Sequence, residues 1–137
     1  MTRSPLVRPR MLAVVMAGGV VGVALRETAL LPVAATEDAA AVPLATLVVN
    51  VVGSFLLGIV VVALGDRHPL WRAFAGTGML GGFTTYSAFA VQSAEASASA
   101  PVWGVLLAVG AVCLGLAAAA LGIGAARAIR TAFGRSV

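Results

Sequence analysis

Long stretches without a charged residue divide this chain into four apolar segments. A helix needs about 20 predominantly apolar residues to cross a bilayer. We therefore predict membrane-spanning helices over residues 11–31, 42–64, 73–94 and 102–126. Helices are expected because an open sheet cannot satisfy its backbone hydrogen bonds in lipid. The whole chain, residues 1–137, is predicted to form a single all-α membrane domain.

The first apolar segment also has features of a secretory signal. Three arginines precede it, and the small residues of Val33-Ala34-Ala35 follow it, as at a cleavage site. Against this interpretation, Arg26 and Glu27 interrupt the apolar run before that site, and three further spans follow it. We expect a membrane span rather than a cleaved signal.

Composition supports a membrane protein and excludes several other classes. Hydrophobic residues make up 61% of the chain and charged residues only 10%, against roughly 25% charged residues in soluble domains. The net charge of +4 comes from arginines that lie outside the long apolar runs, so membrane flanks explain them better than nucleic acid does. With Cys113 and His68 as its single cysteine and histidine, the chain can form no internal disulfide, and we expect no metal cluster of these residues. We predict that it is not an enzyme.

The distribution of arginines predicts an orientation. Four spans place the N-terminus, the loop around residues 65–72 and the C-terminus on one side. Eight of the nine arginines belong to that side, and only Arg26 belongs to the other. Because cytoplasmic loops carry an excess of basic residues, we expect both termini to be cytoplasmic and the protein to lie in the plasma membrane.

The second predicted span carries a row of polar residues. Thr46, Asn50 and Ser54 stand four apart and so share one face of a helix. Polar groups at this depth face a bundle interior or a cavity. Asn50 is predicted either to line such a cavity or to make an interhelical hydrogen bond that holds subunits together.

The third predicted span contains a run that disfavours an unbroken helix. Paired glycines and paired threonines lie near its centre, in the segment from Gly81 to Phe89. A helix broken at membrane depth exposes carbonyl oxygens, which bind ions in transporters. The alternatives are an ion site at mid-membrane and a simple packing kink. Beyond the break, Tyr86 and Phe89 share a helical face, where ring edges can favour an anion without carrying a charge.

Small residues recur at helical spacing in two spans. Gly18 and Gly22, and likewise Gly78 and Gly82, form small-xxx-small patterns that let helices approach closely. Four short spans also make a poor closed bundle around an aqueous path. We therefore expect close helix packing and oligomerisation.

Taken together, these residues resemble the fluoride channels of the Fluc (CrcB) family. Three motifs occur in the family's order and spacing: Gly19-x-x-Gly22-x-x-x-Arg26, then Thr46-x-x-x-Asn50-x-x-Gly53-Ser54-Phe55-x-x-Gly58, then Gly76-x-x-x-x-Gly81-Gly82-x-Thr84-Thr85-Tyr86-Ser87-x-Phe89. With the four spans, the resemblance covers essentially the whole chain. It implies an antiparallel (dual-topology) dimer with two pores that export fluoride passively and confer fluoride resistance.

The resemblance also implies roles for individual residues. A structural sodium ion on the dimer axis would be held by the backbone carbonyls of Gly81 and Thr84. The fluoride pores would be lined by Asn50 as an amide donor, by the ring edges of Tyr86 and Phe89, and by the hydroxyls of Thr85 and Ser87. Arg26 would lie near a vestibule.

Three features depart from the family pattern. Tyr86 stands where the family usually has phenylalanine, so its hydroxyl would either bind fluoride directly and slow conduction, or face elsewhere. The segment from Val102 to Ala126 lacks the polar residues that line the family's pore. The arginine bias fits poorly with a subunit that inserts both ways. It suggests a heterodimer with an oppositely oriented paralogue as an alternative to a homodimer.

Two other functions compete with a channel. A small multidrug-resistance exporter is also a short four-span protein, but it needs a carboxylate in the middle of its first span, and here Glu27 lies near the end of that span. A non-transporting membrane scaffold would explain the small-residue patterns. It would not explain Asn50 or the break in the third span.

Overall fold

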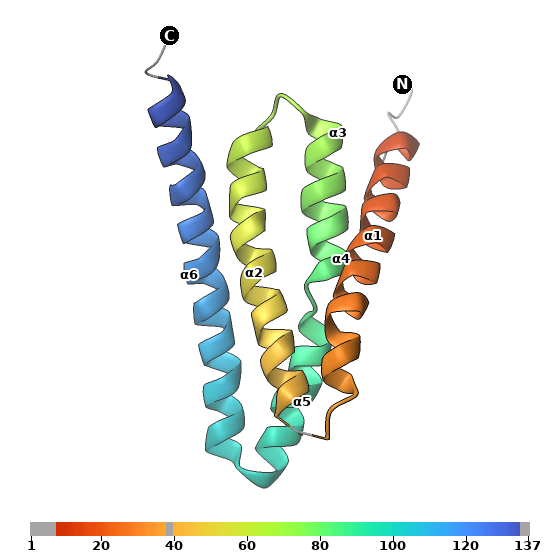
Figure 1. Ribbon diagram of the computed structural model, residues 1–137, viewed down its shortest axis with the longest axis vertical. Helices are drawn as coiled ribbons and strands as arrows, with labels where there is room; N and C mark the ends of the chain where they lie inside the picture. Colours follow the sequence, from red (N-terminus) through yellow and green to blue (C-terminus); the bar gives the residue numbers. More distant parts are fainter. Residues whose placement is uncertain (1–7, 38–39, 135–137) are drawn as a thin grey trace, which may run out of the picture.

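The computed structural model describes residues 8–37 and 40–134, in which every regular element is helical. The long helices are α1 (Pro9–Ala34), α2 (Ala41–Leu64) and α6 (Pro101–Gly134). Between α2 and α6 lie α3 (Pro69–Arg72), the π-helix η1 (Ala73–Leu80), α4 (Gly81–Phe83) and α5 (Tyr86–Ser99). Figure 1 shows these four pieces running in succession beside α1 and α2, and we call them together the third span.

The long helices confirm that this is a membrane protein. Three segments in the described part of the chain are long and apolar enough to cross a bilayer, namely Pro9–Ala34, Ala41–Leu64 and Gly104–Ala132. They correspond to the predicted spans at 11–31, 42–64 and 102–126. The predicted span at 73–94 lies within the third span, but a break divides it, so that it is a bent helix and not a single one.

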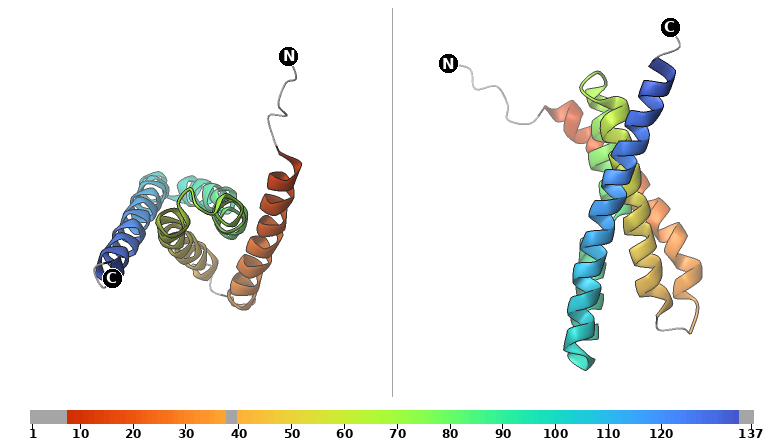
Figure 2. Two further views of the ribbon diagram at one scale, coloured as in Figure 1. Left: turned by 90° about the horizontal axis from the view of Figure 1, so that it is seen from above. Right: turned by 90° about the vertical axis from the view of Figure 1, so that its left-hand side faces the viewer.

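The helices pack as two pairs, one formed by α2 and α6 and the other by α1 and the third span. Helix α6 packs along α2, and α1 packs against η1 and α4, so that α1 and α6 lie on opposite sides of the molecule (Figure 2). Helix α1 begins, α6 ends and α2 is joined to α3 at the same end (Figure 1). The arginines near these positions therefore share that end, as the pattern predicted. Arg3 and Arg135 belong to the same predicted set but lie outside the described residues.

Glycines allow α1 and the third span to approach to backbone contact. A Cβ atom on Gly22 would collide with the carbonyl oxygen of Met79, and one on Gly78 would lie 2.6 Å from the carbonyl oxygen of Val15. A Cβ on Gly82 would lie 2.5 Å from the Gly19 carbonyl oxygen. The close packing expected from the small-xxx-small patterns is confirmed, and it lies within one chain.

The pair Gly22 and Gly19 offers a matched test of this packing. We expect Gly22→Ala to destabilise the protein by about 1–3 kcal/mol, because the added methyl overpacks a backbone contact. Gly19→Ala should be neutral, since its Cβ would meet nothing within 4 Å. Thermal unfolding of both variants in detergent checks this, and equal melting temperatures would contradict it.

Candidate functional site

The third span is broken at Thr84 and Thr85, between α4 and α5. The Thr84 backbone is extended, with φ −77° and ψ 153°. Its N–H and its hydroxyl both donate to the Leu80 carbonyl, at 3.0 and 2.9 Å, and so close α4. The Thr85 hydroxyl accepts the N–H of Ala88 at 3.2 Å and caps α5. The two threonines thus end one helix and start the next, which confirms the predicted break.

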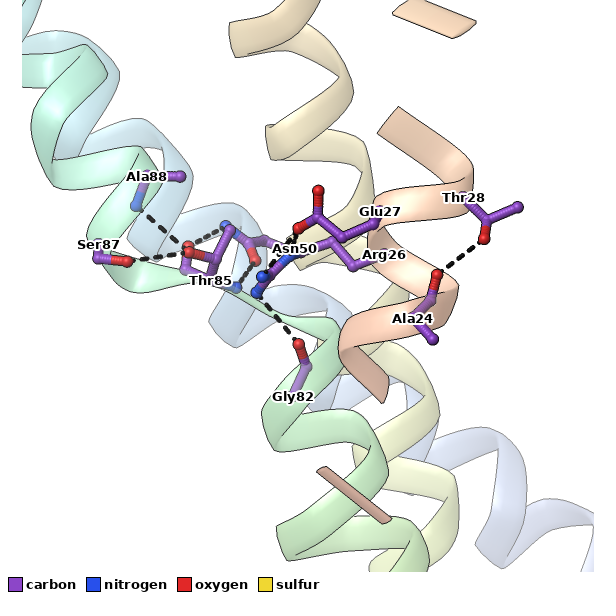
Figure 3. A network of polar contacts seen from close by, with 9 residues as sticks. All are labelled: Ala24, Arg26, Glu27, Thr28, Asn50, Gly82, Thr85, Ser87 and Ala88. Atoms are coloured by element: carbon purple, nitrogen blue, oxygen red, sulfur yellow. Dashed lines mark hydrogen bonds and ion pairs between the residues drawn. The ribbon is translucent and has the colours of Figure 1, made fainter. Parts of the chain in front are cut away.

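Asn50 holds the break from α2 (Figure 3). Its Oδ1 accepts the N–H of Thr85 at 2.8 Å, and its Nδ2 donates to the Thr85 carbonyl at 2.9 Å. One amide side chain therefore pairs with both backbone groups of a residue that has left the helical ladder. The sequence left open a role in lining a cavity and an interhelical hydrogen bond between subunits; the structure shows hydrogen bonds between α2 and the third span within one chain.

These side-chain bonds leave particular carbonyls without their helical donors. In an unbroken helix the N–H of Thr85 would donate to the Gly81 carbonyl, and that of Ala88 to the Thr84 carbonyl. Here the first donates to Asn50 and the second to the Thr85 hydroxyl. The two residues whose carbonyls were predicted to bind sodium, Gly81 and Thr84, are therefore among those that lose their helical donors at the break.

A groove of about 660 Å³ lies between α2, the third span and α6. It brings together six of the eight predicted site residues: Asn50, Gly81, Thr84, Thr85, Tyr86 and Phe89. Tyr86 is 78% exposed, so its ring and hydroxyl are accessible. Arg72 is the one charged residue among the described residues that line the groove, and it pairs with Asp66 at 2.9 Å.

Helix α6 supplies a groove wall without polar side chains. Its lining residues are Ala111, Val112, Gly115, Leu116 and Ala119. The aliphatic character predicted for this span therefore extends to the surface beside the candidate site. Polar groups in the groove come from α2 and the third span.

The remaining predicted residues, Arg26 and Ser87, lie in a second cavity of about 630 Å³. Thr85 lines both cavities, and its hydroxyl lies 3.3 Å from that of Ser87. Arg26 forms an ion pair with Glu27 at 3.0 Å. The predicted site therefore consists of two compartments on either side of the break.

Two lining residues of the second cavity were missed by the sequence analysis. Gln92 donates from Nε2 to the Thr46 hydroxyl at 3.2 Å, and Thr46 is only 1% exposed. Glu95 lines the same cavity three residues further along α5. The signal for Gln92 was an amide inside an apolar segment, the same signal that identified Asn50.

The π-helix η1 was also not anticipated. Its eight residues lead directly into α4, and its glycines at 76 and 78 are buried. At the end of η1 the N–H of Gly81 donates to the Gly76 carbonyl, five residues back. π-Helical segments are rare and occur frequently at functional sites, which agrees with the position of η1 beside the break.

Sequence comparison gives an independent result. Residues 13–123 match the family described as "CrcB-like protein, Camphor Resistance (CrcB)". A protein named Fluoride-specific ion channel FluC 2 from Leifsonia xyli is 42% identical over 127 residues, covering 88% of this chain and 86% of the relative. Relatives of the same name from Nocardia farcinica and Thermobifida fusca are 38% and 41% identical, covering 91% and 76% of this chain and 91% and 78% of their own lengths. The sequence matches and the broken third span lead to one conclusion: the chain belongs to the CrcB family.

Proposed function

We propose that this protein is a fluoride-selective channel that lowers cytoplasmic fluoride by passive export. The relatives that match most of the chain are named as fluoride-specific ion channels, not as enzymes. The structural observation that carries the proposal is the break at Thr84 and Thr85. Asn50 holds this break beside a groove whose lining is almost entirely uncharged.

An uncharged lining suits a small, strongly hydrated anion. An unpaired positive charge in the path would bind fluoride too firmly for rapid exit. Asn50 uses one amide hydrogen on Thr85, which leaves its second available to an ion. The electropositive ring edges of Tyr86 and Phe89 and the positive end of the α5 dipole add weak attraction. These groups replace water around fluoride without trapping it.

A sodium ion fits the carbonyls of Gly81 and Thr84. Hard cations prefer oxygen ligands, both residues line the groove, and their carbonyls lack their helical donors. Among residues 8–37 and 40–134, no three His, Cys, Asp or Glu side chains gather into a metal site. In this proposal the cation is held by backbone oxygens, and it would supply a fixed positive potential beside the pores.

The open groove supports the proposal of an antiparallel dimer. Leu116 and Val112 line it and are 69% and 53% exposed in the single chain. A second subunit in the opposite orientation would cover these side chains and bring a second pair of Gly81 and Thr84 carbonyls to the same place. The partner is either another copy of this chain or an oppositely oriented paralogue. In a heterodimer the arginine-rich end of this chain, with both termini, would face the cytoplasm, whereas in an antiparallel homodimer it would do so in only one of the two subunits.

Halide efflux from liposomes tests the function. Vesicles that contain the purified protein should release fluoride rapidly and chloride at the rate of empty vesicles. Equal release of fluoride and chloride would contradict the proposal. So would the release of neither halide, both from this chain alone and from this chain coexpressed with a paralogue. Efflux from this chain alone would show that no paralogue is required, whereas efflux only after coexpression with a paralogue would show that one is.

A further inference from the structure

Arg26 reaches the break from α1, and it contacts a different residue of the break from Asn50. Its Nη1 donates to the Gly82 carbonyl at 3.1 Å (Figure 3). In an unbroken helix this carbonyl would accept the N–H of Tyr86, which here starts α5 beyond the break. A carbonyl without a partner is costly at membrane depth. Arg26 therefore provides the donor that the break has removed.

Glu27 holds the guanidinium in this position. Its Oε1 accepts from Nε and Nη2 of Arg26 at 3.2 and 3.0 Å, while Nη1 remains directed to Gly82. The Arg26 side chain is 20% exposed and that of Glu27 57%. The carboxylate also neutralises the arginine, so that the cavity holds an ion pair there and not a free positive charge.

The helix face on which Arg26 lies fixes its distance from the break. Gly18, Gly22 and Arg26 stand four apart and share one face of α1. The first two place α1 in backbone contact with η1 and α4. Arg26 follows one turn later on the same face, where the close contact ends and the broken segment begins. The backbone contacts of α1 with η1 and α4 thus determine where the guanidinium of Arg26 lies.

We infer that Arg26 is a positioning residue that determines which carbonyls of the break face the groove. It holds the Gly82 carbonyl toward α1, while Gly81 and Thr84 line the groove and keep their carbonyls without helical donors. Its importance for permeation rests on the proposed function. This role differs from that of a vestibule charge, because it depends on the geometry of a hydrogen bond and not on electrostatic attraction.

Hydrogen exchange in lipid nanodiscs tests the positioning role without reference to transport. In Arg26→Lys and Arg26→Gln, the amides of Thr85 and Ala88 should exchange at least about tenfold faster than in wild type, because a charged hydrogen bond to the break is lost. Arg130→Gln is the matched control, since Arg130 also donates to a backbone carbonyl, that of Val62 at 3.4 Å, away from the break. Unchanged exchange in both Arg26 variants would overturn the inference.

Fluoride efflux then separates geometry from charge. If Arg26 positions the break, both variants should slow efflux at least about tenfold at low and high ionic strength. A charge effect would instead leave Arg26→Lys with the efflux rate of wild type. It would make Arg26→Gln slower than wild type at low ionic strength but not at high ionic strength, and this result would overturn the inference. Where the Arg26 variants do not fold, Glu27→Gln should give a smaller rise in exchange at the same amides, and no rise would count against the inference. If the wild-type protein gave no efflux, only the proposed function would be rejected, because hydrogen exchange would still test the positioning role of Arg26.

Discussion

Replacing Asn50 with aspartate is expected to reduce fluoride efflux at least about 100-fold. Aspartate can still accept the N–H of Thr85, but its second oxygen would face the Thr85 carbonyl, which now receives an amide N–H at 2.9 Å. Two acceptors would then repel each other at the break. The carboxylate would also place a negative charge on the groove, where it repels the permeating anion.

A second substitution separates these two effects. Asn50→Ala removes both hydrogen bonds to Thr85 without adding a charge, so efflux should fall, but less than in Asn50→Asp. Thr28→Val is a control for the loss of a polar side chain, because the Thr28 hydroxyl bonds only to the Ala24 carbonyl of its own helix. Efflux from liposomes at matched protein density provides the measurement. Near wild-type efflux from Asn50→Asp would contradict a role for this amide in conduction.

The break in the third span could be predicted because its causes are local. Paired glycines weaken the helix before the break, and threonine hydroxyls compete for backbone groups within four residues of their own position. The structure shows such bonds from the Thr84 hydroxyl to Leu80 and from the Ala88 N–H to the Thr85 hydroxyl. Local sequence therefore determined where the helix ends and begins again.

The contacts that hold the break could not be predicted in the same way. The bonds of Asn50 to Thr85 and of Arg26 to Gly82 join residues 35 and 56 positions apart. Polar type and helical spacing indicated that Asn50 has a partner, but they did not indicate which one. The division of the site into two cavities likewise depends on how three helices meet around Thr85. The spacing of residues along one helix does not indicate how different helices meet, so it could not predict the two cavities.

The approach of α2 to the break suggests a second substitution with a large effect on efflux. Gly53 lies one turn from Asn50 on α2 and is buried. A Cβ atom there would collide with Cγ2 of Thr84 and lie 3.3 Å from the Phe83 ring. The nearest obstacle is a β-branched side chain on the extended residue of the break, which has little freedom to rotate away. A larger residue at position 53 must therefore displace Thr84 itself.

We expect Gly53→Val to lower fluoride efflux at least about 30-fold, corresponding to roughly 2 kcal/mol of strain from overpacking at the break. Gly110→Val is the matched control, since it adds the same side chain to an apolar helix where a Cβ meets nothing within 4 Å. If the carbonyls of Gly81 and Thr84 hold sodium, the remaining efflux of Gly53→Val should also require a higher sodium concentration than wild type. Such a shift would place the strain at the cation site, because simple blockage of the groove lowers efflux equally at every sodium concentration. Wild-type efflux from Gly53→Val would show that the contact between α2 and Thr84 has no part in conduction.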